Sequence, residues 1–86
     1  MKNLYITFGH YHKHSVEGKV LDKDAVAMIP CKTEEEGRAI ARSYFSTQWA
    51  FAYFEEDWEE EELVYYPRGY VMLPHVQVDN LKGEEK

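Results

Sequence analysis

The chain has 86 residues, of which 44% are hydrophobic and 15% aromatic, so it can form one modest hydrophobic core but not two domains. Its formal net charge of -6 argues against direct nucleic-acid binding, because phosphate backbones are recognised by surplus Lys and Arg. One cysteine excludes an internal disulfide, and no apolar run has the roughly 20 residues of a membrane span. The N-terminus has no signal-peptide h-region, so we expect a soluble cytoplasmic protein that binds no membrane.

The first third of the chain predicts two strands. Residues 3–8 and 24–30 are largely apolar runs of strand length, and Pro30 is expected to close the second. Residues 10–23 lie between them and are polar, with Gly18 as the expected turn.

A helix is predicted over residues 34–45. Thr33 and Glu36 match a capping box, in which the hydroxyl accepts from an amide of the first turn and the carboxylate reaches back to the cap amide. Small, apolar and aromatic residues then recur at helical spacing and predict a buried stripe of Gly37, Ile40, Ala41, Tyr44 and Phe45.

The second half of the chain predicts two more strands, over residues 48–54 and 70–73, with a turn at Pro67-Arg68-Gly69. The order is β-β-α-β-β, which is typical of an α+β fold with one helix packed on a small, mainly antiparallel sheet. We expect residues 1–77 to form one compact domain and residues 78–86 to be a polar, disordered tail.

The face of the sheet away from the helix is expected to be poorly covered in so short a chain. Alternation in the strands places Tyr5 and Tyr53 on that face. These aromatic side chains are therefore candidates for a homodimer contact or for the floor of a ligand site.

One acidic segment holds the whole charge excess. Seven acids surround one tryptophan in the run Glu55, Glu56, Asp57, Trp58, Glu59, Glu60, Glu61, Glu62, and without these acids the net charge is +1. One interpretation is a solvated loop or short helical turn that aids solubility. The other is a surface that imitates nucleic-acid phosphates or docks on a basic partner, with Trp58 as an interface anchor.

A second cluster of polar residues suggests ligand chemistry. On an extended backbone His10, His12 and His14 project from one face and predict a transition-metal site, with Zn as the default ion and Asp22 or Asp24 as a further ligand. The alternative is a loop of solvated histidines, and no cofactor is expected in that case. A metal-dependent enzyme would have to use this cluster, because no nucleophile motif is present and Cys31 has no identifiable base partner.

Arg68 adds another alternative for the same region. Its guanidinium suits a phosphate, so His12, His14, Asp24 and Arg68 together would bind a nucleotide or another phosphorylated ligand. The simpler interpretation is an ion pair between Arg68 and the nearby acidic segment.

Several short motifs resemble a family of small proteins encoded by bacteriophages and prophages, whose members open with Tyr-Ile-Thr-Phe-Gly-Gln and close with Phe-Pro-Arg-Gly. The matching residues are Tyr5 to Gly9, His12, His14, Asp22 to Asp24, Glu35 to Arg38 and Tyr66 to Gly69, so the resemblance covers most of residues 4–72. It departs at His10, where Gln is usual, and at Tyr66, where Phe is usual.

The resemblance implies a phage context, in which small proteins often bind a host factor and block bacterial immunity. Our leading hypothesis is therefore a protein that inhibits a host defence component, such as a CRISPR effector or a restriction system, by stoichiometric binding in the cytoplasm of the infected bacterium. The alternatives are a protein that sequesters a nucleotide signal and a metal-dependent enzyme.

Overall fold

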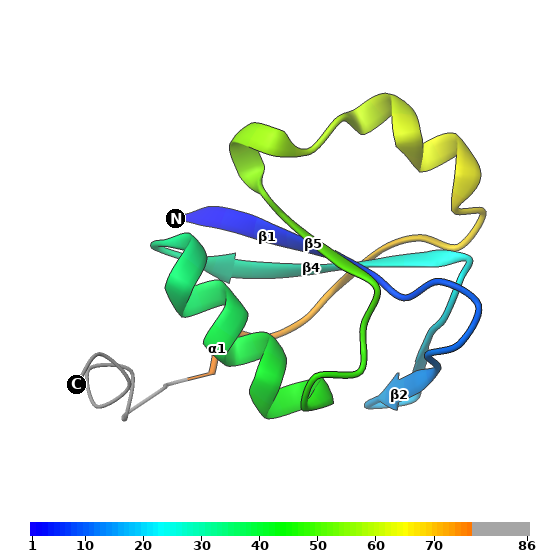
Figure 1. Ribbon diagram of the computed structural model, residues 1–86, viewed down its shortest axis with the longest axis horizontal. Coiled ribbons are helices and arrows are strands. Elements are labelled where there is room, and N and C mark those ends of the chain that lie inside the picture. The colour runs from blue at the N-terminus through cyan, green and yellow to red at the C-terminus, as the bar shows by residue number, and fades with distance from the viewer. Residues whose placement is uncertain (77–86) are drawn as a thin grey trace.

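The computed structural model describes residues 1–76, and its main sheet has four strands in the order β5 (Phe51–Phe54), β1 (Lys2–Thr7), β4 (Ala25–Cys31) and β6 (Gly69–Met72). β1 pairs antiparallel with both β4 and β5, whereas β6 pairs parallel with β4. The helix α1 (Glu34–Phe45) covers one face of this sheet (Figure 1). The α+β class and the β-β-α-β-β order of the main sheet are confirmed.

A small hairpin was missed by the sequence analysis. β2 (His14–Val16) and β3 (Lys19–Leu21) pair antiparallel through a turn in which Glu17 and Gly18 have φ of 53° and 81°. Two consecutive positive φ values suit the tight turns that match the twist of a hairpin. Strands of three residues show no readable alternation, and this hairpin is held to the body of the protein by the fully buried Leu21.

Pro30 does not end β4, contrary to expectation. The Leu73 amide donates to the Met28 carbonyl at 2.9 Å, so the main chain at Met28 faces β6. Pro30 lies two residues further and faces the same side, beyond the last residue of β6. Its missing N–H therefore removes no ladder hydrogen bond, and the strand continues to Cys31.

The start of α1 confirms the capping box with one difference. Thr33 Oγ1 accepts from the Glu36 amide at 3.1 Å, while Glu36 Oε1 accepts from the Lys32 amide at 2.7 Å, one residue before the cap. The hydrogen bond from the Lys32 amide lowers the pKa of the Glu36 carboxyl, and the contact with His75 lowers it further. No helix within residues 1–76 is long and apolar enough to cross a bilayer.

The main core lies between α1 and the sheet. Its fully buried side chains include Leu4, Ile6, Phe8, Ile29 and Ile40. The helix approaches most closely at Gly37, where an added Cβ would lie 2.8 Å from Cys31 Sγ and 2.9 Å from Leu4 Cβ. A side chain at residue 37 would therefore push α1 off the sheet.

The link between β5 and β6 crosses the face of the sheet opposite α1. β5 and β6 occupy opposite edges, and the link carries two 3₁₀ segments, η1 (Glu55–Asp57) and η2 (Glu60–Tyr65). Figure 1 shows this link as the yellow-green arch on the side of the sheet away from α1. The acidic segment is thus a crossover connection, and β6 is parallel to β4 because of it.

Trp58 fills the space between this crossover and the sheet. Its ring stacks on Tyr5 with centroids 5.1 Å apart and planes 14° apart, and its indole N–H donates to Tyr70 Oη at 2.9 Å. Tyr53 and Tyr66 complete the aromatic layer, with centroids 5.7 and 6.4 Å from Trp58.

The expectation of a poorly covered second face is therefore wrong. Tyr5 is only 8% exposed and Thr7 3% exposed, so the middle of this face offers neither a ligand floor nor a dimer contact. The reason is that a chain joining opposite edges of a sheet has to pass over one of its faces.

We predict that Trp58→Ala lowers the free energy of unfolding by about 2–3 kcal/mol, because the aromatic layer loses its central ring and the half-buried Tyr70 hydroxyl loses its donor. Urea unfolding followed by circular dichroism measures this change. Tyr65→Ala is the matched control, since the Tyr65 side chain is 73% exposed on the same crossover. Equal effects of the two substitutions would contradict the packing role of Trp58.

Candidate functional site

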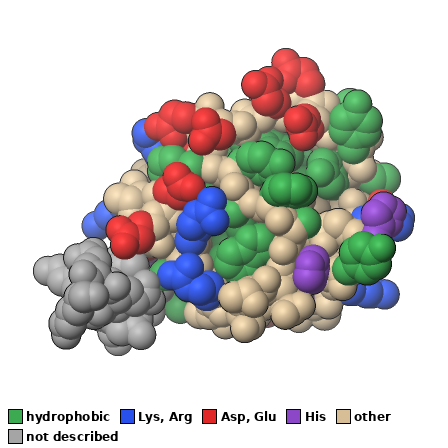
Figure 2. All heavy atoms as spheres, in the orientation of Figure 1, with side chains coloured by type: hydrophobic (Ala, Val, Ile, Leu, Met, Phe, Trp, Pro, Cys, Tyr) green, Lys and Arg blue, Asp and Glu red, His purple; other side chains and the backbone are tan. Residues whose placement is uncertain are grey.

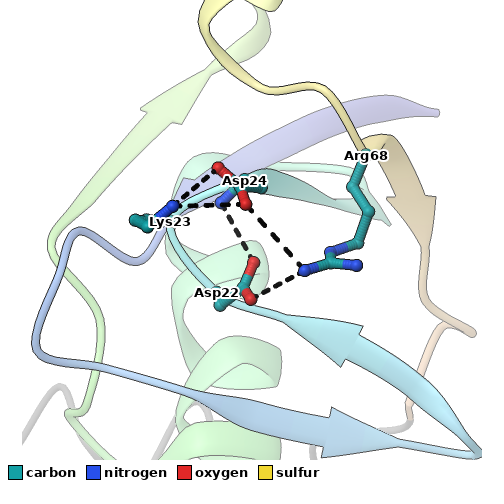
Figure 3. A network of polar contacts seen from close by, with 4 residues as sticks. All are labelled: Asp22, Lys23, Asp24 and Arg68. Carbon is teal, nitrogen blue, oxygen red and sulfur yellow. Dashed lines mark hydrogen bonds and ion pairs between the residues drawn. The ribbon is translucent and has the colours of Figure 1, made fainter.

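The motif residues Asp22, Lys23, Asp24 and Arg68 come together in the structure (Figure 3). Arg68 Nη2 donates to Asp22 Oδ2 at 2.9 Å and lies 4.0 Å from Asp24 Oδ2. The Arg68 amide also donates to the Asp24 carbonyl at 2.8 Å, and the Asp24 amide donates to Asp22 Oδ1 at 3.0 Å. Two segments 46 residues apart are joined by these contacts.

This network ties the end of the crossover to the turn between β3 and β4. Backbone donation from Asp24 and then the Arg68 guanidinium lower the pKa of the Asp22 carboxyl. Lys23 Nζ lies 3.2 Å from Asp24 Oδ1, so two carboxylates balance two cations. The interpretation of Arg68 as a partner of the acidic segment is wrong, because Arg68 pairs with Asp22 and approaches Asp24. The two carboxylates compensate its charge and so disfavour the binding of an anion there.

The three histidines do not form the metal site that an extended backbone would give. Gly9, with φ of 64°, starts a turn that carries His10, and His10 is exposed. His14 Nε2 instead lies 2.7 Å from the Gln48 carbonyl, with its ring 4.7 Å from that of Phe45. His12 is half-buried, and its Nδ1 is buried without a hydrogen-bond partner. Within residues 1–76 no group of three or more His, Cys, Asp or Glu is arranged to hold a metal ion.

The first two acids of the acidic segment are part of the fold. Glu55 Oε1 accepts from the Asn3 amide at 2.9 Å, and Glu56 pairs with Lys2. The hydrogen bond from Lys2 lowers the pKa of the Glu56 carboxyl, and the Lys2 ammonium also lies 5.6 Å from the centre of the Phe54 ring. These contacts anchor the start of the crossover to β1 and β5.

The later acids are exposed and lie beside exposed apolar side chains. Glu59 to Glu62 form no ion pair among the described residues. Val64 and Tyr65 follow them on η2 and are 78% and 73% exposed. Glu59, Glu61, Glu62 and Tyr65 line an open depression, and Figure 2 shows acidic side chains along the top of the molecule beside apolar ones. We call Glu59 to Glu62 with Val64 and Tyr65 the acidic crossover surface.

The acidic crossover surface exposes different apolar side chains from the one that the sequence analysis predicted. Trp58 packs inward on Tyr5 and is not the interface anchor that its position suggested. Val64 and Tyr65 are exposed instead, and the sequence contains a signal for this. A 3₁₀ segment has three residues per turn, so Leu63 and Tyr66 share its inner side while the two residues between them face outward.

Cys31 is a buried structural thiol. It is fully buried beneath Gly37, and burial, with a smaller contribution from Glu36, raises its pKa to about 11. A thiol with this pKa is almost entirely protonated near neutral pH, and the thiolate is the nucleophilic form.

Comparisons with known proteins give no functional assignment for the chain. No family model, curated protein or solved structure matches the chain. The resemblance to small phage proteins thus stays a prediction, and the functional argument depends on what the side chains can bind.

We predict that Asp22→Asn lowers stability near neutral pH by about 1 kcal/mol, the scale of one charge-assisted hydrogen bond at a partly exposed site. The folded-state pKa of Asp22 lies below 3.8, so its charge stabilises the fold above the unfolded-state pKa. That contribution is lost as the pH falls through the folded-state pKa. Unfolding curves at a series of pH values should show wild type and variant converging in acid, whereas Glu17→Gln should change little. A constant difference at every pH would contradict the linkage.

We also predict that the Cys31 thiol reacts with a chromogenic disulfide reagent only after the protein unfolds. The reaction should be slow in the native state and fast in denaturant, because access and thiolate formation both require loss of the core. Rapid labelling of the native protein, at the rate of a free cysteine peptide, would refute this description of the site.

Proposed function

We propose that this chain is a small phage-encoded protein that inhibits a bacterial host factor by stoichiometric binding through the acidic crossover surface. The observation that carries the proposal is the concentration of Glu59 to Glu62 beside exposed Val64 and Tyr65 on one segment. Interfaces combine a few apolar or aromatic anchors with a polar rim in this way.

The crossover is held at both ends, which favours a binding role over a solvated loop. Glu55 and Glu56 anchor its start to β1, and Arg68 anchors its end to Asp22. Trp58 fixes its middle to the sheet. A segment that is already ordered loses little conformational entropy on binding, so more of its contact energy becomes affinity.

The charge of this surface indicates the chemistry of the partner. Four neighbouring carboxylates that pair with no cation of residues 1–76 favour a Lys- or Arg-rich surface, such as the nucleic-acid groove of a bacterial defence effector. The phage-like motifs support the same class of target, in the cytoplasm of the infected host. The partner is a protein and not nucleic acid, since the net charge of -6 repels a phosphate backbone.

The alternative functions lose the residues on which they depended. A nucleotide site needs a free guanidinium, and Arg68 is paired with Asp22. The proposed metal-dependent activity needs three converging histidines, and His10 and His14 are held in different environments. The acidic crossover surface is therefore the site that we propose.

We predict that Glu61→Gln with Glu62→Gln weakens binding of a host protein captured from bacterial lysate by about tenfold, or about 1.4 kcal/mol. Tyr65→Ala should weaken it by a similar factor, because an aromatic anchor is lost. Binding of the purified pair is measured by calorimetry at two salt concentrations, and wild-type binding should weaken steeply with salt.

The matched control is Glu17→Gln with Glu35→Gln, which removes two exposed acids outside the crossover and should leave the affinity unchanged. Tight binding that responds neither to salt nor to the Glu61 and Glu62 substitutions would exclude the acidic crossover surface as the docking site.

A further inference from the structure

The main-chain N–H and C=O groups on the outer edge of β5 form no hydrogen bonds with another strand of residues 1–76. Leu73 N donates to Met28 O, so the main chain of β4 at Met28 faces β6. The N–H and C=O groups of successive residues point to opposite sides of a strand. The residue pairs between β4 and β1 and between β1 and β5 therefore show which residues of β5 face β1 and which face outward. The N–H and C=O groups of Ala52 and Phe54 therefore point outward, in agreement with the 3.5 Å contact between Arg38 Nη2 and Ala52 O.

Although β5 is short, with four residues, its edge lacks the charges and prolines that usually prevent edge-to-edge pairing. β5 reads Phe-Ala-Tyr-Phe and contains no charged residue and no proline. Phe51 is 62% exposed at its start. Apart from the long contact from Arg38, no strand of residues 1–76 lies beyond it.

The charged side chains along α1, beside this edge, are acidic at one end and basic at the other. A second copy of α1 running in the opposite direction would therefore place opposite charges side by side. Glu34, Arg38 and Arg42 follow one another at four-residue spacing, so they form one stripe along α1. Within the chain Arg38 pairs with Glu34 at 3.0 Å, so contacts with a second copy would extend this pair into a longer network. The contact from Arg38 to Ala52 places this stripe on the β5 side of the helix. When two copies meet about a two-fold axis perpendicular to the sheet, their stripes run antiparallel, and Glu34 of each copy faces the Arg42 end of the other.

We propose that the protein forms an isologous dimer in which β5 pairs antiparallel with β5 of a second copy, making one continuous eight-stranded sheet. With Ala52 on the axis, Ala52 exchanges two hydrogen bonds with Ala52 of the partner subunit. Phe51 then lies opposite Tyr53 of the partner subunit on the same face, and its exposed ring gains an aromatic neighbour.

The dimensions of the sheet allow the helices to meet across this axis. Gly37 of α1 packs against both Leu4 of β1 and Cys31 of β4, so each helix lies over the boundary between these strands and the two helix axes would be about four strand spacings, or about 19 Å, apart. Arg38 already reaches Ala52 on the edge strand from this position, so long Glu and Arg side chains of the two copies can meet near the axis. A second copy is thus favoured over an unrelated strand, because it supplies both the free edge and the complementary charges.

Sedimentation velocity from micromolar to millimolar concentration tests the dimer. Wild type should show a reversible monomer–dimer equilibrium, and Phe51→Lys should raise the dimer dissociation constant at least about tenfold. Met72→Lys is the matched control, because it makes the same kind of change at an apolar residue that is 51% exposed on β6, at the opposite edge of the sheet, and should leave the equilibrium unchanged. A wild-type protein that stays monomeric throughout, or a dimer insensitive to Phe51→Lys, would overturn the proposal.

Two further measurements keep the test independent of folding defects. Amide exchange at Ala52 and Phe54 should slow as the concentration rises, while Phe51 and Tyr53, which face β1, should be protected at every concentration. Glu34→Arg alone should weaken the dimer, and adding Arg42→Glu should restore it. A failure of this reciprocal rescue in a folded double variant would exclude the two-fold arrangement.

Discussion

The stacking of Trp58 on Tyr5 is the interaction on which the second half of the structure depends. β5 and β6 lie at opposite edges of the sheet, so residues 55–68 have to cross a face that is built of aromatic side chains. A segment with seven acids cannot bury its own charged groups there at an acceptable cost. One large ring turned inward covers the face, and the carboxylates on either side of it stay in water.

The contacts that hold the crossover on the sheet also fix the conformation of the acidic crossover surface. Trp58, the pairs at Glu55 and Glu56, and the bond from Arg68 to Asp22 hold the segment at its middle and at both ends. The carboxylates of Glu59 to Glu62 are therefore displayed from a fixed backbone. Residues that hold the fold and residues that are exposed lie within one short run, which explains why its composition alone supports both interpretations of the segment.

Features that arise from neighbouring residues could be predicted from the sequence, and features that arise from distant pairings could not. The helix, its Thr33 cap and the buried positions Gly37, Ile40, Ala41 and Phe45 follow from local spacing and are confirmed, whereas Tyr44 of the predicted stripe is only half-buried. The parallel position of β6, the inward direction of Trp58 and the pairing of Arg68 with Asp22 depend on the path of the crossover, which no local pattern encodes. The histidine cluster failed for a related reason, because the turn at Gly9 broke the extended backbone that the prediction assumed.

Because both faces of this small sheet are largely covered, another protein strand could associate with the sheet only along its edges. α1 covers one face and the crossover covers most of the other, so the uncovered main-chain groups lie along the outer strands. On the β5 side the long contact from Arg38 is the one side-chain contact that residues 1–76 make with this edge. The proposed edge pairing would use main-chain groups and the proposed docking on the acidic crossover surface would use side chains, so the two contacts would be chemically independent. A dimer would therefore present two acidic crossover surfaces, and a partner with two basic sites would bind such a dimer more tightly than a monomer.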